Sequence, residues 1–118
     1  MIALAGCEDD QSSQLSLKDV TARVDYFEYT EDTGNNTSRL RYSITFTNPN
    51  DSDVTGFYRI TTNADGLESS KLSSDSSPCY SIAANSTCTY LFDEEDSHDL
   101  GKISTIKLVS VEYKIENN

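Results

Sequence analysis

The segment from residue 39 to residue 47 carries the pattern that most constrains how this chain folds. Apolar side chains occupy every second position, Leu40, Tyr42, Ile44 and Phe46, and polar ones lie between them. A period of two indicates a β-strand with one buried face, because successive side chains of a strand point to opposite sides. The run Asn48-Pro49-Asn50-Asp51 ends this strand, since proline cannot donate to a β-ladder and Asn and Asp favour turns.

Similar short strand patterns recur along the chain, about every 8–14 residues, with turn residues between them. Strands are predicted over about 16–29, 39–47, 54–62, 79–83, 87–92 and 104–115. In the first of these, one phase holds Val20, Ala22, Val24 and Tyr26, and the other holds Phe27 and Tyr29. This change of phase predicts a β-bulge near Asp25–Phe27. Residues 67–77 are predicted to be an exposed Ser-rich loop with at most a short edge strand, and residues 93–101 to be an acidic loop.

These patterns predict an all-β fold. A chain of 118 residues is long enough for one domain with one core. Six or seven short strands without a helical segment favour a single antiparallel β-sandwich of immunoglobulin-like, Greek-key type, with a small β-barrel as the alternative. The Asn-rich corner at 48–51 and the turn at 82–87 resemble features of immunoglobulin-like modules in secreted bacterial proteins. The sandwich domain is assigned to residues 16–118.

The N-terminal run Leu4-Ala5-Gly6-Cys7 resembles the lipobox of bacterial lipoproteins. The resemblance implies that the thiol of Cys7 carries a diacylglycerol and that a peptidase cuts before it. Residues 1–6 are then the end of a signal peptide whose basic and main apolar regions lie upstream. Residues 8–14 are an acidic, polar tether, so residues 1–15 precede the domain. The expected location is the bacterial cell envelope, with the outer membrane favoured over the inner one by the acidic stretch after Cys7.

The chain contains three cysteines, an odd number. Cys79 and Cys88 lie close together in a β-rich region and are predicted to form a disulfide, which would contribute roughly 2.7 kcal/mol by closing a loop of about ten residues. Cys7 is then left without a cysteine partner, as expected of a lipid acceptor.

The acidic segment is the only candidate for a metal site. Its five carboxylates belong to Asp93, Glu94, Glu95, Asp96 and Asp99. Carboxylate oxygens on a loop suit Ca²⁺, but this spacing matches no calcium-loop signature and lacks the bending glycine. The segment is therefore interpreted as a solvated loop, and no metal or cofactor is assigned. The run Asn63-Ala64-Asp65-Gly66 is interpreted as a turn, because the rest of an EF-hand ligand set is missing.

The net charge of −11 excludes nucleic acid as a partner, because a polyanion is repelled by phosphate backbones. The single histidine and the absence of nucleophile or phosphate-loop motifs predict a protein that is not an enzyme. The leading hypothesis is a lipid-anchored envelope protein with a binding or structural role, bound to the membrane and to another envelope protein. The alternatives are an inhibitor or immunity module against a basic protein such as lysozyme, and a calcium- or glycan-dependent adhesion module. The glycan hypothesis rests on Tyr26, Tyr29, Phe57 and Tyr58.

Overall fold

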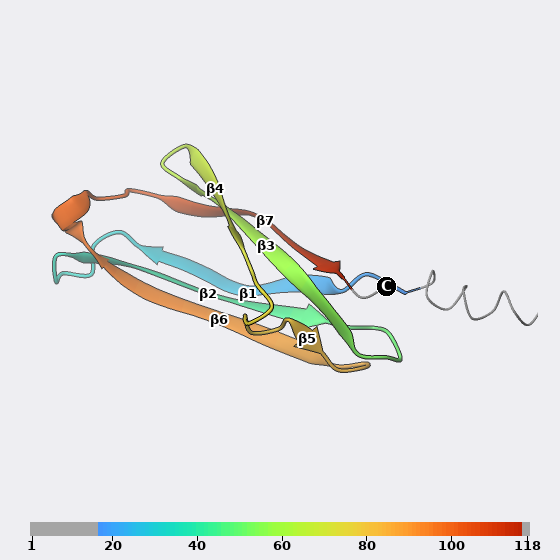
Figure 1. Cartoon of the computed structure of the whole chain (residues 1–118). Coiled ribbons are helices and arrows are strands. Elements are labelled where there is room, and N and C mark those ends of the chain that lie inside the picture. The colour runs from blue at the N-terminus through green and yellow to red at the C-terminus, as the bar shows by residue number, and fades with distance from the viewer. Residues whose placement is uncertain (1–16, 117–118) are drawn as a thin grey trace, which may run out of the picture.

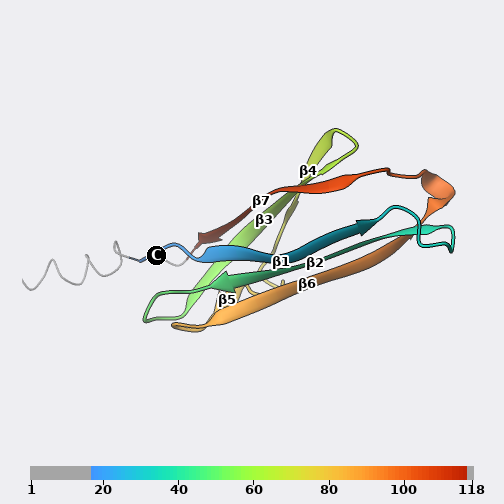
Figure 2. The same ribbon diagram turned by 180° about the vertical axis from the view of Figure 1, so that it is seen from behind.

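The computed structural model describes residues 17–116 and confirms the predicted all-β fold (Figures 1 and 2). Every strand pairing in it is antiparallel. The elements are β1 (Thr21–Thr30), β2 (Thr37–Thr47), β3 (Val54–Ala64), β4 (Leu67–Leu72), β5 (Ser81–Ile82), β6 (Thr87–Ser97), the 3-10 turn η1 (His98–Leu100) and β7 (Ile106–Ile115).

The strands form two sheets packed face to face, a β-sandwich and not a closed barrel. One sheet has the order β1-β2-β6. In the other, β3 is central, with β4 and β5 along one edge and β7 along the opposite edge. The chain crosses between the sheets after β2, after β5 and after β6, which gives Greek-key connections (Figure 1). The two strand orders correspond to A-B-E and C′-C-F of the immunoglobulin fold. Within residues 17–116, no strand takes the place of strand G beside β7.

The core lies between the two central strands, β2 and β3. The side chains at alternate positions of these strands are at most 4 % exposed: Tyr42, Ile44, Phe46, Val54, Tyr58 and Ile60. The rings of Phe46 and Tyr58 lie 4.9 Å apart, and the ring of Tyr42 stacks on Phe92 at 4.7 Å. The sequence period of two therefore produced the buried face it predicted.

The predicted β-bulge is confirmed and falls at Asp25. The pairing of β1 with β2 shifts register between Val24 and Tyr26. The Asp25 carboxylate accepts hydrogen bonds from Ser43 Oγ at 2.9 Å and Thr45 Oγ1 at 2.7 Å, and these bonds, with Arg23, lower its pKa. Tyr26 consequently points to the outer face, opposite Ser43, and does not continue the inward series of Val24.

Three predicted boundaries were wrong. The first strand begins at Thr21 and not near residue 16. The acidic segment is not a loop up to Gly101, because β6 continues to Ser97. The reason is long-range: β2 provides a ladder as far as the pair Thr37–Ser97, and Arg39 makes two hydrogen bonds to Asp93 at 2.8 and 2.6 Å. The strand predicted over 79–83 is reduced to the two residues of β5.

The Asn-rich corner after β2 is a connection between the two sheets. The Asn48 side chain is fully buried, and its Nδ2 donates to the carbonyls of Ser52, Ile82 and Ala83 at 2.9–3.1 Å. Its Oδ1 accepts from the backbone N–H and the Nδ2 of Asn50. The corner and the turn at residues 82–87, two features that the sequence presents separately, are thus joined by one side chain.

Candidate functional site

The sandwich has two distinct ends. At one end, which we call the tether end, the chain leads from Leu17 into β1 (Figure 1). Backbone N–H and C=O of Lys18 bond to the Asn50 side chain at 2.7 and 2.9 Å, so the start of the domain is fixed to the Asn-rich corner. Cys7, the predicted lipid acceptor, lies outside the described residues.

The predicted disulfide between Cys79 and Cys88 is present at the tether half of the molecule, with a Cα–Cα distance of 5.6 Å. Cys88 is on β6 opposite Phe46, and Cys79 lies two residues before β5. The bond therefore links β6, at the edge of one sheet, to the segment that enters β5, at the edge of the other. Tyr113 Oη adds to this contact by donating to the carbonyls of Cys79 and Tyr80 at 3.0 and 2.9 Å.

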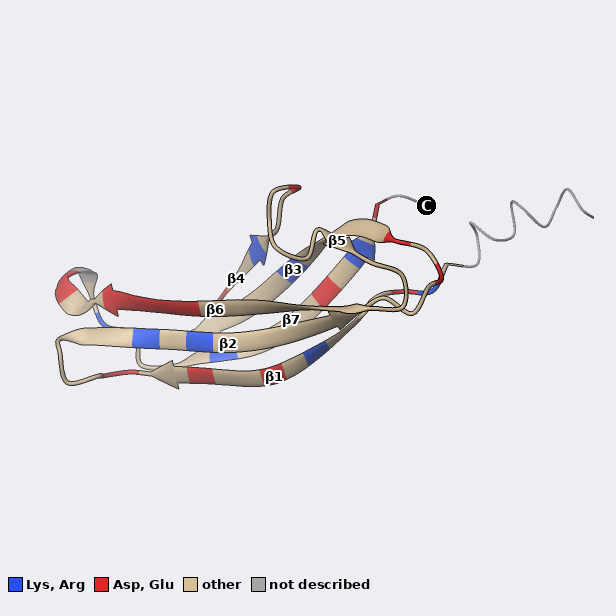
Figure 3. Ribbon diagram, turned by 90° about the horizontal axis from the view of Figure 1, so that it is seen from below, with Lys and Arg blue, Asp and Glu red and all other residues tan. Residues whose placement is uncertain are grey.

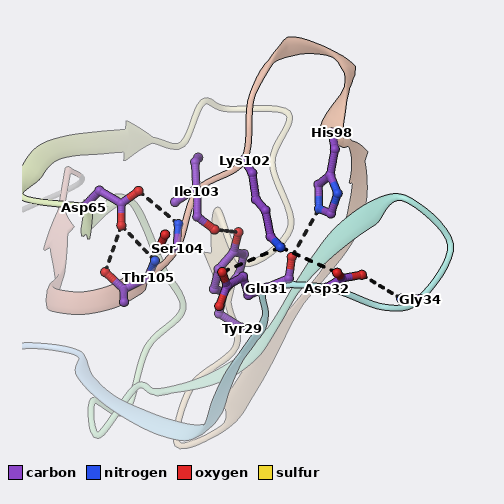
Figure 4. Close-up of polar contacts among 10 residues, drawn as sticks. All are labelled: Tyr29, Glu31, Asp32, Gly34, Asp65, His98, Lys102, Ile103, Ser104 and Thr105. Atoms are coloured by element: carbon purple, nitrogen blue, oxygen red, sulfur yellow. Dashed lines mark hydrogen bonds and ion pairs between the residues drawn. The ribbon is translucent and has the colours of Figure 1, made fainter.

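The opposite end, which we call the far end, consists of residues 31–36 and 97–105. Lys102 Nζ lies 3.8 Å from Glu31 and 3.5 Å from Asp32, and Tyr29 Oη donates to the carbonyl of Ile103 (Figure 4). The Nε2 of His98 is 3.2 Å from the carbonyl of Glu31. The histidine thus connects two loops, and no nucleophilic side chain lies against it in the described contacts.

The turn predicted at Asn63–Gly66 is confirmed, and it supports the far end. Both carboxylate oxygens of Asp65 accept hydrogen bonds from backbone N–H groups, of Ser104 and of Thr105, each at 2.9 Å (Figure 4). These bonds lower the pKa of Asp65. The backbone N–H of Gly34 similarly lowers the pKa of Asp32, with Lys102 as a second cause. The far-end loops are therefore ordered by carboxylates that act as structural acceptors.

The acidic residues of β6 do not gather around one point. Asp93 and Glu95 lie on the outer face, where they contact Arg39 and Thr37, whereas Glu94 and Asp96 line a hollow between the sheets. Alternate residues of a strand point to opposite faces, so these carboxylates cannot surround one cation. Within residues 17–116, no group of three His, Cys, Asp or Glu side chains could hold a metal ion. Figure 3 shows the acidic stretch of β6 beside the basic residues of β2.

The four aromatic residues of the glycan hypothesis do not share a surface. Tyr58 is 4 % exposed and donates to the carbonyl of Pro78. Tyr26 lies on the outer face of the first sheet, and Tyr29 is held at the far end. Phe57 lies on the outer face of the second sheet. Its ring is 5.6 Å from that of Tyr80, beside a hollow of about 570 Å³ that Arg59 and Lys114 also line.

One candidate site was not predicted from the sequence. A groove of about 540 Å³ runs between β1 and β7 and is lined by Leu17, Asp19, Val20, Ala22 and residues 111–115. The apolar alternation of both strands was visible in the sequence. The alternation does not show that these two strands lie next to each other, each at the edge of its sheet.

Comparison of the chain with protein-family models, with curated proteins and with solved structures finds no match. In the described part of the chain, no helix has the length and hydropathy needed to cross a bilayer.

Proposed function

We propose that this chain is a non-catalytic, lipid-anchored protein of the bacterial envelope that presents its far end to a protein partner. The observation that carries the proposal is the position of the two ends. The chain joins the domain at the tether end, and the ordered, charged loops lie at the opposite end of the strands (Figure 1). A lipid on Cys7 would leave those loops directed away from the membrane.

Two further features support this location. The Lys18–Asn50 hydrogen bonds fix the point at which the tether leaves the domain. The Cys79–Cys88 disulfide suits an oxidising compartment outside the cytoplasm, where such bonds persist.

The anchor is tested by labelling. The gene is expressed in a bacterium with its own upstream sequence, and the wild type is compared with Cys7→Ser for uptake of labelled palmitate and for partition into detergent. We expect label and detergent partition for the wild type and neither for Cys7→Ser. Cys88→Ser is the matched control, because it removes a different cysteine and should still take up label. An unlabelled wild type recovered from the cytoplasm would refute the anchor.

The charge of the far half favours one class of partner, a basic protein that the domain would bind or inhibit. Within residues 28–41 and 93–102, eight carboxylates stand against three cations: Glu28, Glu31, Asp32, Asp93, Glu94, Glu95, Asp96 and Asp99 against Arg39, Arg41 and Lys102. Opposite charges steer association and make it sensitive to salt. Among the described residues, Glu94 and Asp96 form no ion pair.

Lysozyme serves as the basic probe for this second candidate function. We expect binding that weakens as salt is raised and that weakens in the double variant E94Q/D96N. The control, Asp19→Asn at the tether end, changes an exposed carboxylate away from the far end and should bind as the wild type does. Equal binding by E94Q/D96N and the wild type would contradict a role for this surface.

A further inference from the structure

β1 and β7 form an open seam along one side of the sandwich. β1 pairs only with β2 and β7 only with β3, so among the described residues the facing edges of β1 and β7 have no ladder partner. The two strands lie side by side and run in opposite directions (Figures 1 and 2). They belong to different sheets of the sandwich, and packed sheets stand about 10 Å apart, twice the spacing of a ladder.

The apolar side chains at the seam are incompletely covered. Val24 on β1 is 40 % exposed, and the inward side chains of Val111 and Tyr113 on β7 are only half-buried, whereas Ile44 and Ile60 on the central strands are 0 and 2 % exposed. The groove is lined by Leu17, Val20 and Ala22, at and just before the start of β1, and by Val111, Tyr113 and Ile115 of β7, with Asp19, Glu112 and Lys114 among them. A long apolar strand edge without a partner is a template for the addition of another strand.

The backbone of β7 is oriented for such an addition. The N–H of Glu116 donates to the carbonyl of Thr55 at 2.8 Å, toward β3. Because backbone groups alternate sides along a strand, the N–H groups of Ile115, Tyr113 and Val111 point away from β3, toward the open edge.

The edges of β1 and β7 match one another in sequence. If the strands pair antiparallel with Ala22 opposite Tyr113, every inward side chain meets an inward side chain. The pairs are Val20–Ile115, Ala22–Tyr113, Val24–Val111, Phe27–Leu108 and Tyr29–Ile106. Both strands carry a bulge, at Asp25 and at Val109, and the two bulges fall between the same two pairs. The inward side chains of β1 and β7 therefore stay opposite one another along the full length of the pairing.

The same register also matches charge. It places Glu112 opposite Arg23 and Lys107 opposite Glu28, and opposite charges across a ladder are stabilising. Lys107 and Glu112 are exposed and form no ion pair in the described structure. A β7 strand paired with another β7 over its full length would instead place Lys107 opposite Lys114. The charges thus favour β1 over β7 as the added strand.

We propose that two copies of this chain form a symmetric dimer in which β1 of each copy pairs with β7 of the other. A two-fold axis along the seam, parallel to the strands, preserves strand direction, so β1 of the second copy lies antiparallel to β7 in the register described above. Both contacts form at once, as an isologous interface requires. Each sheet then continues into the partner in the order β4-β3-β7-β1-β2-β6, and the groove closes.

The symmetry has a consequence for the envelope. An axis parallel to the strands leaves both tether ends at the same end of the dimer, so two lipid anchors could enter one membrane. This consequence rests on the proposed function, but the dimer itself does not.

The first test measures oligomeric state with the full chain carrying Cys7→Ser, so that it is independent of lipidation. Sedimentation should give twice the chain mass of 13.1 kDa. Glu112→Lys reverses a charge at both symmetric contacts and should weaken association about tenfold. Adding Arg23→Glu should restore it, and Glu68→Lys on β4, the matched control, should leave it unchanged. Circular dichroism verifies that each variant is folded. A monomer at all concentrations up to about 1 mM, or a failure of the double variant to recover, would overturn the proposal.

The second test fixes the register. Both chains carry Cys7→Ser, and one with Thr21→Cys is mixed with another with Lys114→Cys, two positions that the pairing places opposite each other. Because each chain carries only one new cysteine, a disulfide between them must join two copies. We expect a cross-linked dimer on a non-reducing gel, and none when Thr30→Cys replaces Thr21→Cys. If the chain sediments as a dimer but the Thr21→Cys and Lys114→Cys chains do not cross-link, the dimer uses another interface and the proposal fails.

Discussion

Replacement of Asn48 should lower the free energy of unfolding by a large amount for so small a side chain. It is fully buried at the corner between the two sheets. Its Nδ2 donates to three carbonyls, at 2.9 Å to Ser52 and at 3.1 Å to both Ile82 and Ala83, and its Oδ1 accepts two bonds from Asn50. Asn48→Ala would leave the carbonyl of Ile82 and the N–H groups of Asn50, all in buried residues, without these bonds.

The magnitude follows from those contacts. Two amide hydrogens and two accepted bonds make four hydrogen bonds, at about 1 kcal/mol each, so the free energy of unfolding should fall by about 4 kcal/mol. For a domain of this size the melting temperature should fall by about 20 °C. Asn35, an exposed residue of the β1–β2 turn, is the matched control. Asn35→Ala should change stability by no more than about 0.5 kcal/mol.

Asn48→Asp makes the test sharper, because it keeps the shape and changes only the donors. A carboxylate there would face the carbonyls of Ile82 and Ala83 without solvent, so burial should raise the pKa of that carboxyl group above its unfolded value. A raised folded pKa favours folding below the unfolded pKa and loses that contribution as pH rises. The destabilisation should therefore be smallest near pH 3 and grow toward pH 7. Urea unfolding across this range measures it, and a penalty independent of pH would refute the reasoning.

Three further predictions concern separate parts of the fold. Replacing Cys79 and Cys88 by Ser should lower the free energy of unfolding by about 2–3 kcal/mol in urea titrations. An unchanged free energy of unfolding would contradict a stabilising disulfide between the sheets. Gly56→Ala should cost about 1–3 kcal/mol, because its Cβ would meet the backbone of β7 and lie 2.7 Å from the Tyr113 ring, and unchanged stability would show that β7 sits farther away. The pKa of Asp65 is lowered by its bonds to backbone N–H groups, so their contribution to stability is present above the unfolded pKa and lost as pH falls through the folded one. The amide shifts of residues 104 and 105 should titrate with a midpoint below 3.8, and a midpoint above that value would count against these bonds.

Local pattern was sufficient for much of the architecture. The alternation from Leu40 to Phe46 located the central strand, and the change of phase between Tyr26 and Phe27 located a bulge to within a residue or two, because a strand's period and its interruption are properties of consecutive residues. The turn at Asn63–Gly66 was equally local, since its side chains and its glycine act within four residues.

The errors and omissions all involve residues far apart in the chain. The acidic run from Asp93 was predicted to be a loop because the segment it pairs with, around Arg39, lies 54 positions earlier in the chain. The bonds from Asn48 to Ile82 and Ala83 span 34 and 35 positions. The sequence therefore identified the corner and the turn as separate features but did not show that one buried amide joins them.

The sequence alone determined that this chain is all-β, which residues face inward along its principal strands and which two cysteines pair, because each follows from short-range periodicity or spacing. Only the tertiary structure decided that β1 and β7 become neighbouring edges with a groove between them. Which strand edges stay open depends on how every other strand has paired, and that is a property of the whole fold.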